Sequence, residues 1–298
     1  MRTINSTPSR PFGRLREWVC APLIVALAAS CCQAITINAI YRGPGELLGT
    51  FGTAQSAPAN AVGGGTLQAI MDVAVDYWES AYGDPFTLTV QYGWFPRTGS
   101  TTGTHRLLSE GGTPHRETSA AIALDSDGST IWFADPTPTD SVEFSTYTDY
   151  TADLGAGVMN VGREFTGGFG HAARHDLFTT VLHEVGHALG LSSANNAFVA
   201  ERGDNDVDVL SPLPFAGSQI PLNSGNAHLN MSHPLMRSSR GSGVRRLASE
   251  ADILANAQIS QFTQVNLMPL VPEPATWVLL AAGVSALPLV RRRRAHRS

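Results

Sequence analysis

Two histidines and a glutamate stand at a spacing that suits a catalytic metal. Residues 183–187 read His-Glu-Val-Gly-His. On a helix, positions i and i+4 lie one turn apart on the same side, so His183 and His187 can both point at one ion. A catalytic Zn²⁺ has three protein ligands and one water, whose pKa it lowers to about 7. Glu184 follows the first histidine and can accept a proton from that water, so the motif predicts metal-assisted hydrolysis with Glu184 as general base.

The segment around this motif has the pattern of a buried helix. Residues 176–191 carry apolar side chains at helical spacing, and Gly190 follows as a residue that lets the chain turn sharply. We therefore expect a helix over 176–191 that presents both imidazoles on one side. The apolar positions are Leu177, Val181, Leu182, Val185 and Leu189.

Residues 175–191, HDLFTTVLHEVGHALGL, resemble the active-site helix of the metzincin clan of zinc endopeptidases. The clan motif continues as HExxHxxGxxH; Gly190 matches it, but Ser193 stands where the third histidine is expected. The resemblance implies an α+β zincin fold: a twisted mixed sheet, an active-site helix and a less regular C-terminal subdomain. It also implies a zinc metalloendopeptidase that hydrolyses peptide bonds in a protein or peptide substrate.

A catalytic zinc site needs a third protein ligand, which in this chain would come from outside the helix. Residues 227–236 resemble the distant third histidine and Met-turn of leishmanolysin-like proteases, which implies His228 as the ligand and Met236 as the methionine under the zinc site. His233 is the second choice, because it stands only three residues before Met236.

Two alternatives to a third histidine stay open. Carboxylates are legitimate zinc ligands, and Glu201, Asp204, Asp206 and Asp208 follow the motif closely. The other alternative is that no third ligand exists. The chain would then be a catalytically degenerate zincin-fold protein that serves as a surface or matrix binding protein. The other histidines of the body, including His105, are assigned no role.

The elements before the motif are predicted from hydrophobic periodicity. Apolar residues at helical spacing follow Thr66 and end before the Gly-Asp-Pro of residues 83–85, which predicts a helix. Alternating apolar residues over 86–95 predict a strand, and residues 120–124 and 130–133 are short strand candidates. The turn between these two candidates, residues 125–128, is interpreted as a hairpin turn. The Ala/Gly/Ser-rich stretch 54–65 and the Gly/Thr/Ser-rich stretch 98–114 are predicted as loops.

A final helix is predicted at the end of the body, within residues 243–259. Ser249 and Asp252 have the spacing of a capping box at its start. This stretch resembles the closing helix of zincin-like domains. We therefore predict a zincin-like metalloprotease domain over residues 35–270.

The N-terminal segment has the pattern of a secretory signal peptide. Four arginines lie in residues 1–18, an apolar run covers residues 19–29, and small residues flank position 33. This predicts a signal peptide over residues 1–34 that is cut near Ala34. Cys31 after Ser30 offers a lipoprotein acceptor as the alternative. All three cysteines lie in the first 32 residues, so a processed chain would contain no disulfide.

The C-terminal segment resembles the PEP-CTERM sorting signal of Gram-negative bacteria. Residues 271–274 read Val-Pro-Glu-Pro, residues 275–290 are uncharged, and residues 291–294 are four arginines. The resemblance over 271–298 implies a transmembrane helix that anchors the protein transiently, recognition by exosortase-type sorting machinery, and release to the cell surface or extracellular matrix. A plain membrane tail anchor is the alternative.

The charge of the body excludes one class of partner. Residues 35–270 contain 11 arginines, no lysine and 23 acidic residues, which gives a net charge of −12. A nucleic-acid-binding protein needs a basic face, so no nucleic acid is expected as partner. The acidic balance suits an exported soluble domain.

Overall fold

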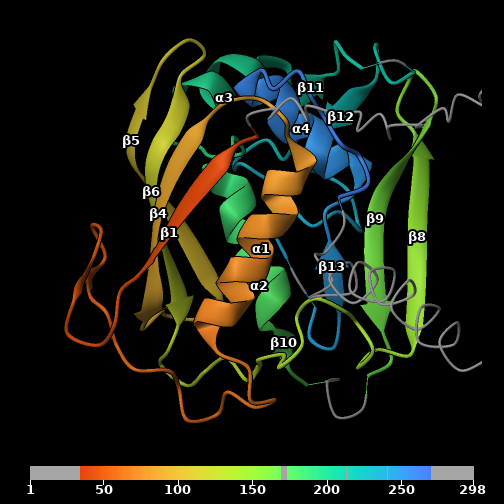
Figure 1. The fold of residues 1–298 in the computed structure, drawn as a ribbon. Helices are drawn as coiled ribbons and strands as arrows, with labels where there is room; N and C mark the ends of the chain where they lie inside the picture. The colour runs from red at the N-terminus through yellow and green to blue at the C-terminus, as the bar shows by residue number, and fades with distance from the viewer. Residues whose placement is uncertain (1–33, 169–172, 213, 240, 270–298) are drawn as a thin grey trace, which may run out of the picture. The chain divides into compact units, whose positions relative to one another are not determined.

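The computed structural model describes residues 34–168, 173–212, 214–239 and 241–269 (Figure 1). The chain divides into two units, Met1–Cys31 and Cys32–Ser298, and every described residue belongs to the second. The predicted signal peptide, apart from Ala34, and the predicted sorting signal lie outside the described residues. Within those residues, no helix combines the length and apolar character needed to cross a membrane.

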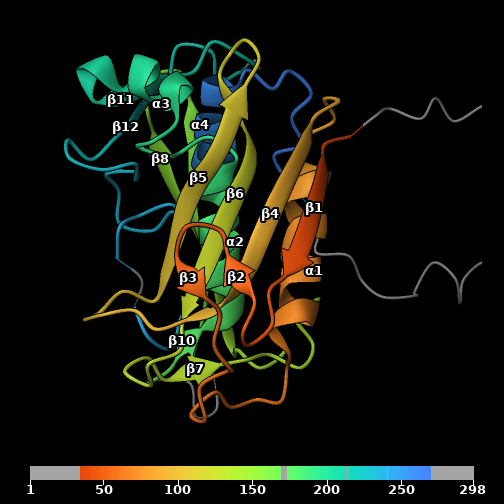
Figure 2. The same ribbon diagram turned by 90° about the vertical axis from the view of Figure 1, so that its left-hand side faces the viewer.

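A twisted four-stranded mixed sheet forms one side of the unit. Its strands lie in the order β1 (Thr36–Tyr41), β4 (Thr87–Phe95), β6 (Arg116–Asp125) and β5 (Gly103–Gly111), as Figure 2 shows. The first three are parallel, and β5 runs antiparallel to β6 at the edge. Residues 120–125 of β6 are buried on both faces, as expected for a central strand of a parallel sheet covered on both sides.

Two helices pack against this sheet. α1 (Leu67–Ala81) begins at Thr66, whose side chain accepts from the Ala69 N–H, and α2 (Leu177–Ala188) begins at Asp176, which accepts from the Thr179 N–H. All twelve residues of α2 are buried. Trp78 of α1 donates its indole N–H to the Leu182 carbonyl at 3.0 Å, which fixes the two helices against each other. Both helices were predicted, and α2 contains residues 183–187.

A second, antiparallel sheet lies on the other side of α2. It contains β13 (Arg245–Leu247), β9 (Val158–Thr166) and β8 (Thr146–Asp153) in that order (Figure 1). α4 (Glu250–Ser260) packs against β9. The predicted capping box forms at the start of α4, because the side chains of Ser249 and Asp252 each accept from the other's backbone N–H.

Short elements connect these layers. They are β2 (Leu47–Leu48) with β3 (Gly52–Thr53), β7 (Trp132–Phe133) with β10 (His175–Asp176), β11 (Asp206–Asp208) with β12 (Gln219–Pro221), α3 (Asn196–Glu201) and the 3₁₀ helix η1 (Arg202–Asp204). The described part of the chain is thus mixed α and β with a twisted mixed sheet, as predicted, and it contains four α-helices, of which α3 was not predicted.

Two predictions about local structure are wrong. The stretch 98–114, predicted as a loop, contains the nine-residue strand β5. Seven of its nine residues are half-buried and the other two, Arg106 and Ser109, are exposed, so burial does not alternate along the strand and its sequence has no period of two. The turn at 125–128 does not close a hairpin, because β7 pairs with β10 rather than with β6. Asp125 instead folds the turn locally, accepting the N–H groups of Arg97 and Asp127.

Candidate metal centre

Three histidines from two distant segments converge in the structure. The ring centroid of His183 lies 4.6 Å from that of His187 and 5.2 Å from that of His228, and the last two lie 4.8 Å apart. One ring nitrogen from each lies within 4.8 Å of the others. His183 and His187 are buried on α2, and His228 is half-buried on the segment after β12. The structure therefore brings together the three residues that were predicted as ligands.

Each of the three rings is held through its Nδ1 atom. His183 Nδ1 lies 2.8 Å from the Leu235 carbonyl, His187 Nδ1 bonds the Leu191 carbonyl, and His228 Nδ1 lies 3.0 Å from Asn226 Oδ1. An oxygen acceptor at Nδ1 favours the tautomer protonated there, in which Nε2 is the ring atom that can bind a metal. The three Nε2 atoms are therefore the candidate ligand atoms of this group.

The turn at Leu235 and Met236 packs against α2 beside its two histidines. Gly186 lies between the two histidines of α2, and a Cβ there would stand 2.5 Å from Met236 Sδ, so only glycine lets this methionine pack so closely. The Asp252 carboxylate of α4 accepts the N–H groups of Leu235 and Met236 at 3.0 and 2.8 Å. Burial raises the pKa of Asp252, and these hydrogen bonds oppose that rise. α4 therefore fixes the turn whose carbonyl orients His183.

Glu184 lies between α2 and the edge strand. Its side chain is buried, and a Cβ on Gly103 of β5 would stand 2.6 Å from its Oε1 atom. Glu184 and the three histidines all line one cleft of about 1010 Å³. The carboxylate thus borders the same space as the three rings.

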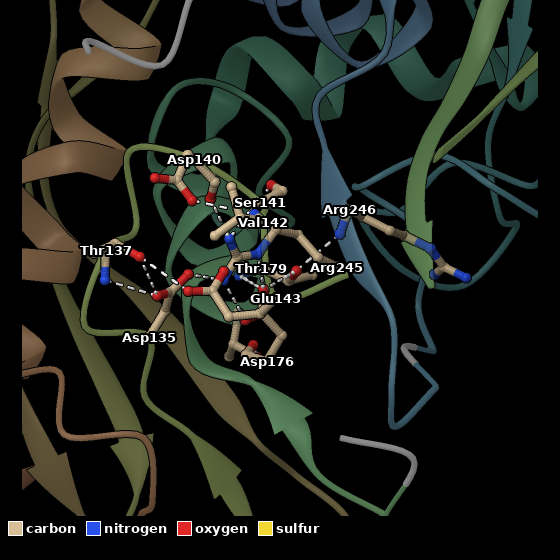
Figure 3. Close-up of polar contacts among 11 residues, drawn as sticks. Asp135, Thr137, Asp140, Ser141, Val142, Glu143, Asp176, Thr179, Arg245 and Arg246 are labelled. Carbon is tan, nitrogen blue, oxygen red and sulfur yellow. Dashed lines mark hydrogen bonds and ion pairs between the residues drawn. The ribbon is translucent and has the colours of Figure 1, made fainter. Parts of the chain in front are cut away.

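The start of α2 is fixed by a buried ion cluster (Figure 3). Arg245 of β13 contacts Asp176, the N-cap of α2, at 3.0 Å and Asp135 at 2.5 Å, and all three side chains are buried. Burial lowers the pKa of Arg245, but the two carboxylates outweigh it and hold the pKa above its ordinary value. This arginine therefore stays charged and ties the helix to the second sheet.

The alternative ligands lie elsewhere. His233 stacks on Tyr150, with ring centroids 3.5 Å apart, and its Nδ1 lies 3.2 Å from Glu164 Oε1. The three aspartates of residues 204–208 form a group of their own, in which Asp208 donates its N–H to Glu201. The structure therefore does not bring His233 or these carboxylates to the histidines of α2.

One residue near the site was missed by sequence reasoning. His105 of β5 lines the cleft, its ring centroid lies 6.0 Å from that of His187, and its Nε2 lies 2.7 Å from Glu117 Oε2. Residues 98–114 were interpreted as a loop, so no facing direction was assigned to it. Strand alternation from Gly103 would have placed His105 on the side of α2.

No protein-family model, no characterised protein and no solved structure matches the chain. The three histidines, Glu184 and the cleft therefore carry the functional argument by their geometry and chemistry alone.

Proposed function

We propose that the protein is a zinc-dependent endopeptidase, with His183, His187 and His228 as metal ligands and Glu184 as general base. The observation that carries this proposal is the convergence of three oriented histidines beside a carboxylate in one cleft. The convergence joins a local motif to a histidine that follows it by 41 residues.

The donor set fits Zn²⁺. Three neutral imidazoles with a free fourth position are a ligand set of catalytic zinc sites. When bound, Zn²⁺ supplies a Lewis acid that polarises the scissile carbonyl and acidifies water. The carbonyls of Leu235 and Leu191 hold two of the rings in the ligating orientation. Such partners behind the ligands commonly change metal affinity by about 10–100-fold.

We assign the acid–base chemistry of the proposed reaction to Glu184. Its carboxylate is aligned by α2 and by the close backbone of Gly103, and it borders the cleft. In the proposed reaction, this carboxylate takes a proton from the attacking water and gives it to the leaving amine. A cleft of about 1010 Å³ lies at the upper end of the range of about 300–1,000 Å³ for small-ligand sites, so it has room for several residues of an extended peptide.

The proposed location is outside the cytoplasm. The predicted signal peptide directs export, and the predicted sorting signal hands the chain to exosortase-type machinery after a transient membrane-anchored stage. The acidic body, with a net charge of −12 over residues 35–270, suits a soluble exported domain.

The test uses the purified full-length protein on an unstructured protein substrate, with and without a zinc chelator. We expect chelator-sensitive cleavage and about one zinc per chain. Glu184→Ala should abolish cleavage and keep the zinc, whereas His228→Ala should lose the zinc. His115→Ala is the matched control, because the His115 side chain is 60% exposed on the turn after β5.

Two results would contradict the proposal. Cleavage by Glu184→Ala would show that another group is the base. A protein that binds zinc, or none, and cleaves no substrate would support the non-catalytic binding protein instead.

A further inference from the structure

The walls of the cleft are made of small hydroxyl-bearing side chains. Among the described residues that line it, 11 of 24 are serine or threonine, so hydroxyl-bearing residues are the commonest type in the lining. They come from four separate segments: the start of β5 and the residues before it at 100–104, the loop at 129–130, the loop after α2 at 192–193 and the segment at 238–239. Leu107 is the only described lining residue that is aliphatic and larger than alanine, and none is Phe, Tyr or Trp.

Charged groups are few in the same lining. Glu184 is the only acid and Arg106 the only arginine among the described lining residues. The Arg106 guanidinium is already engaged, because it donates to the Thr50 carbonyl at 2.8 Å and lies 4.2 Å above the Phe51 ring. Charge therefore gives the cleft little selectivity for charged side chains.

This lining differs from that of an apolar specificity pocket. Ligand sites usually combine a mostly hydrophobic and aromatic lining with a few polar groups, and such a lining rewards large apolar side chains. Against hydroxyls, a leucine or phenylalanine side chain removes water without replacing its hydrogen bonds. Serine, threonine and asparagine side chains can both donate and accept, and glycine leaves its peptide groups accessible.

We infer that the cleft selects peptides whose side chains around the scissile bond are small, polar and uncharged: serine, threonine, asparagine and glycine. This inference rests on the proposed endopeptidase function and narrows its substrate class. The selecting groups are the hydroxyls of the cleft walls.

The test compares two peptides of equal length with the zinc-loaded, full-length protein. One carries Ser-Thr-Asn-Gly at its centre and the other Leu-Phe-Leu-Phe, in identical flanks. We expect kcat/KM to be at least about tenfold higher for the polar peptide. The apolar peptide would displace water from the hydroxyls of the cleft wall without replacing its hydrogen bonds. Equal rates, or faster cleavage of the apolar peptide, would overturn the inference.

A variant of the wall links the preference to the cleft. Ser193 is exposed and lines the cleft after α2. Ser193→Leu should lower the polar-to-apolar ratio of kcat/KM several-fold, because it replaces one hydroxyl of the cleft wall by an aliphatic surface. Ser56→Leu is the matched control, since Ser56 is also exposed but is not among the residues that line the cleft. An unchanged ratio in Ser193→Leu would contradict the assignment to this wall.

Binding separates the failure of this inference from failure of the proposed function. Titration calorimetry on the Glu184→Gln protein measures the Kd of both peptides without turnover. The polar peptide should bind at least about tenfold more tightly, whether or not the wild type cleaves it. Tighter binding of the polar peptide without any cleavage overturns the endopeptidase proposal alone. Tighter binding of the apolar peptide, or no binding of the polar one, overturns the inference.

Discussion

Replacing Gly103 by alanine tests whether the edge strand must leave room for Glu184. An alanine Cβ would stand 2.6 Å from Glu184 Oε1 and 2.9 Å from its Cγ, whereas ordinary contacts begin at 3.4 Å. The carboxylate or the strand must therefore move by about 0.8 Å. A buried carboxylate between α2 and β5 has little freedom to take up that shift without changing its direction.

The expected loss follows from this displacement. A misplacement of about 1 Å in a catalytic group costs about 100-fold in rate, which corresponds to about 2.7 kcal/mol in activation free energy. We expect kcat/KM of Gly103→Ala to fall by about that factor while zinc content stays near one per chain. Thermal stability should change little, because alanine reduces the entropy of the unfolded chain and offsets part of the strain.

A glycine on the same strand gives the control. A Cβ on Gly111 would meet only Thr118 Cγ2, at 4.0 Å, so Gly111→Ala should keep wild-type kcat/KM. The assay measures peptide cleavage, bound zinc and the unfolding midpoint for both variants. Full activity in Gly103→Ala would refute the close positioning of Glu184, and zinc loss with unfolding would show a structural effect instead.

Three further predictions concern the supports of the site and the pH dependence of folding. Asp252→Asn should lower the free energy of unfolding in urea by about 2–4 kcal/mol and weaken zinc binding, because the carboxylate accepts the Met236 N–H and other donors. An unchanged zinc Kd would show that the turn held by Asp252 does not affect the metal site. Arg245→Met should cost about 3–5 kcal/mol in chemical denaturation, because it leaves two buried carboxylates without their cation. Burial raises the pKa of Asp84, but hydrogen bonds from residues 263 and 264 outweigh it and hold the pKa below its ordinary value. The stabilisation of the fold by ionised Asp84 is therefore present at neutral pH and is lost as the pH falls through that lowered pKa. Asp84→Asn should flatten the acid side of a plot of unfolding free energy against pH. A plot parallel to that of the wild type would contradict this prediction.

Three of the four described α-helices, α1, α2 and α4, were predictable because their signals are local. Thr66 and Asp176 both cap helices with their own side chains, and the apolar spacing after each is regular. The capping box of Ser249 and Asp252 is equally local. In each case the residues that define the element lie within a few positions of one another, so the sequence pattern and the structure agree.

The edge strand and the third histidine were harder, because distant residues decide them. β5 has no alternating pattern, and its pairing with β6 defines it as a strand. His228 and His233 stand five positions apart on the same irregular segment. Packing distinguishes the two histidines. His233 lies against Gly162 of β9 and stacks on Tyr150. The ring of His228 lies beside that of His183 on α2. The sequence of residues 227–236 alone does not indicate which of these two histidines lies beside α2.

The separation along the sequence between α2 and the segments that complete the site sets the order in which the site can form. A chain that has folded only as far as α2 has two of the three histidines, and His228 arrives after two further short strands. The turn that orients His183 is then held by Asp252, the third residue of the last described helix. Contacts of such sequence separation form late in folding. A nascent chain therefore lacks the assembled group of three histidines until nearly all of the body has emerged and docked, so the order of the sequence places assembly of this candidate site at the end of folding.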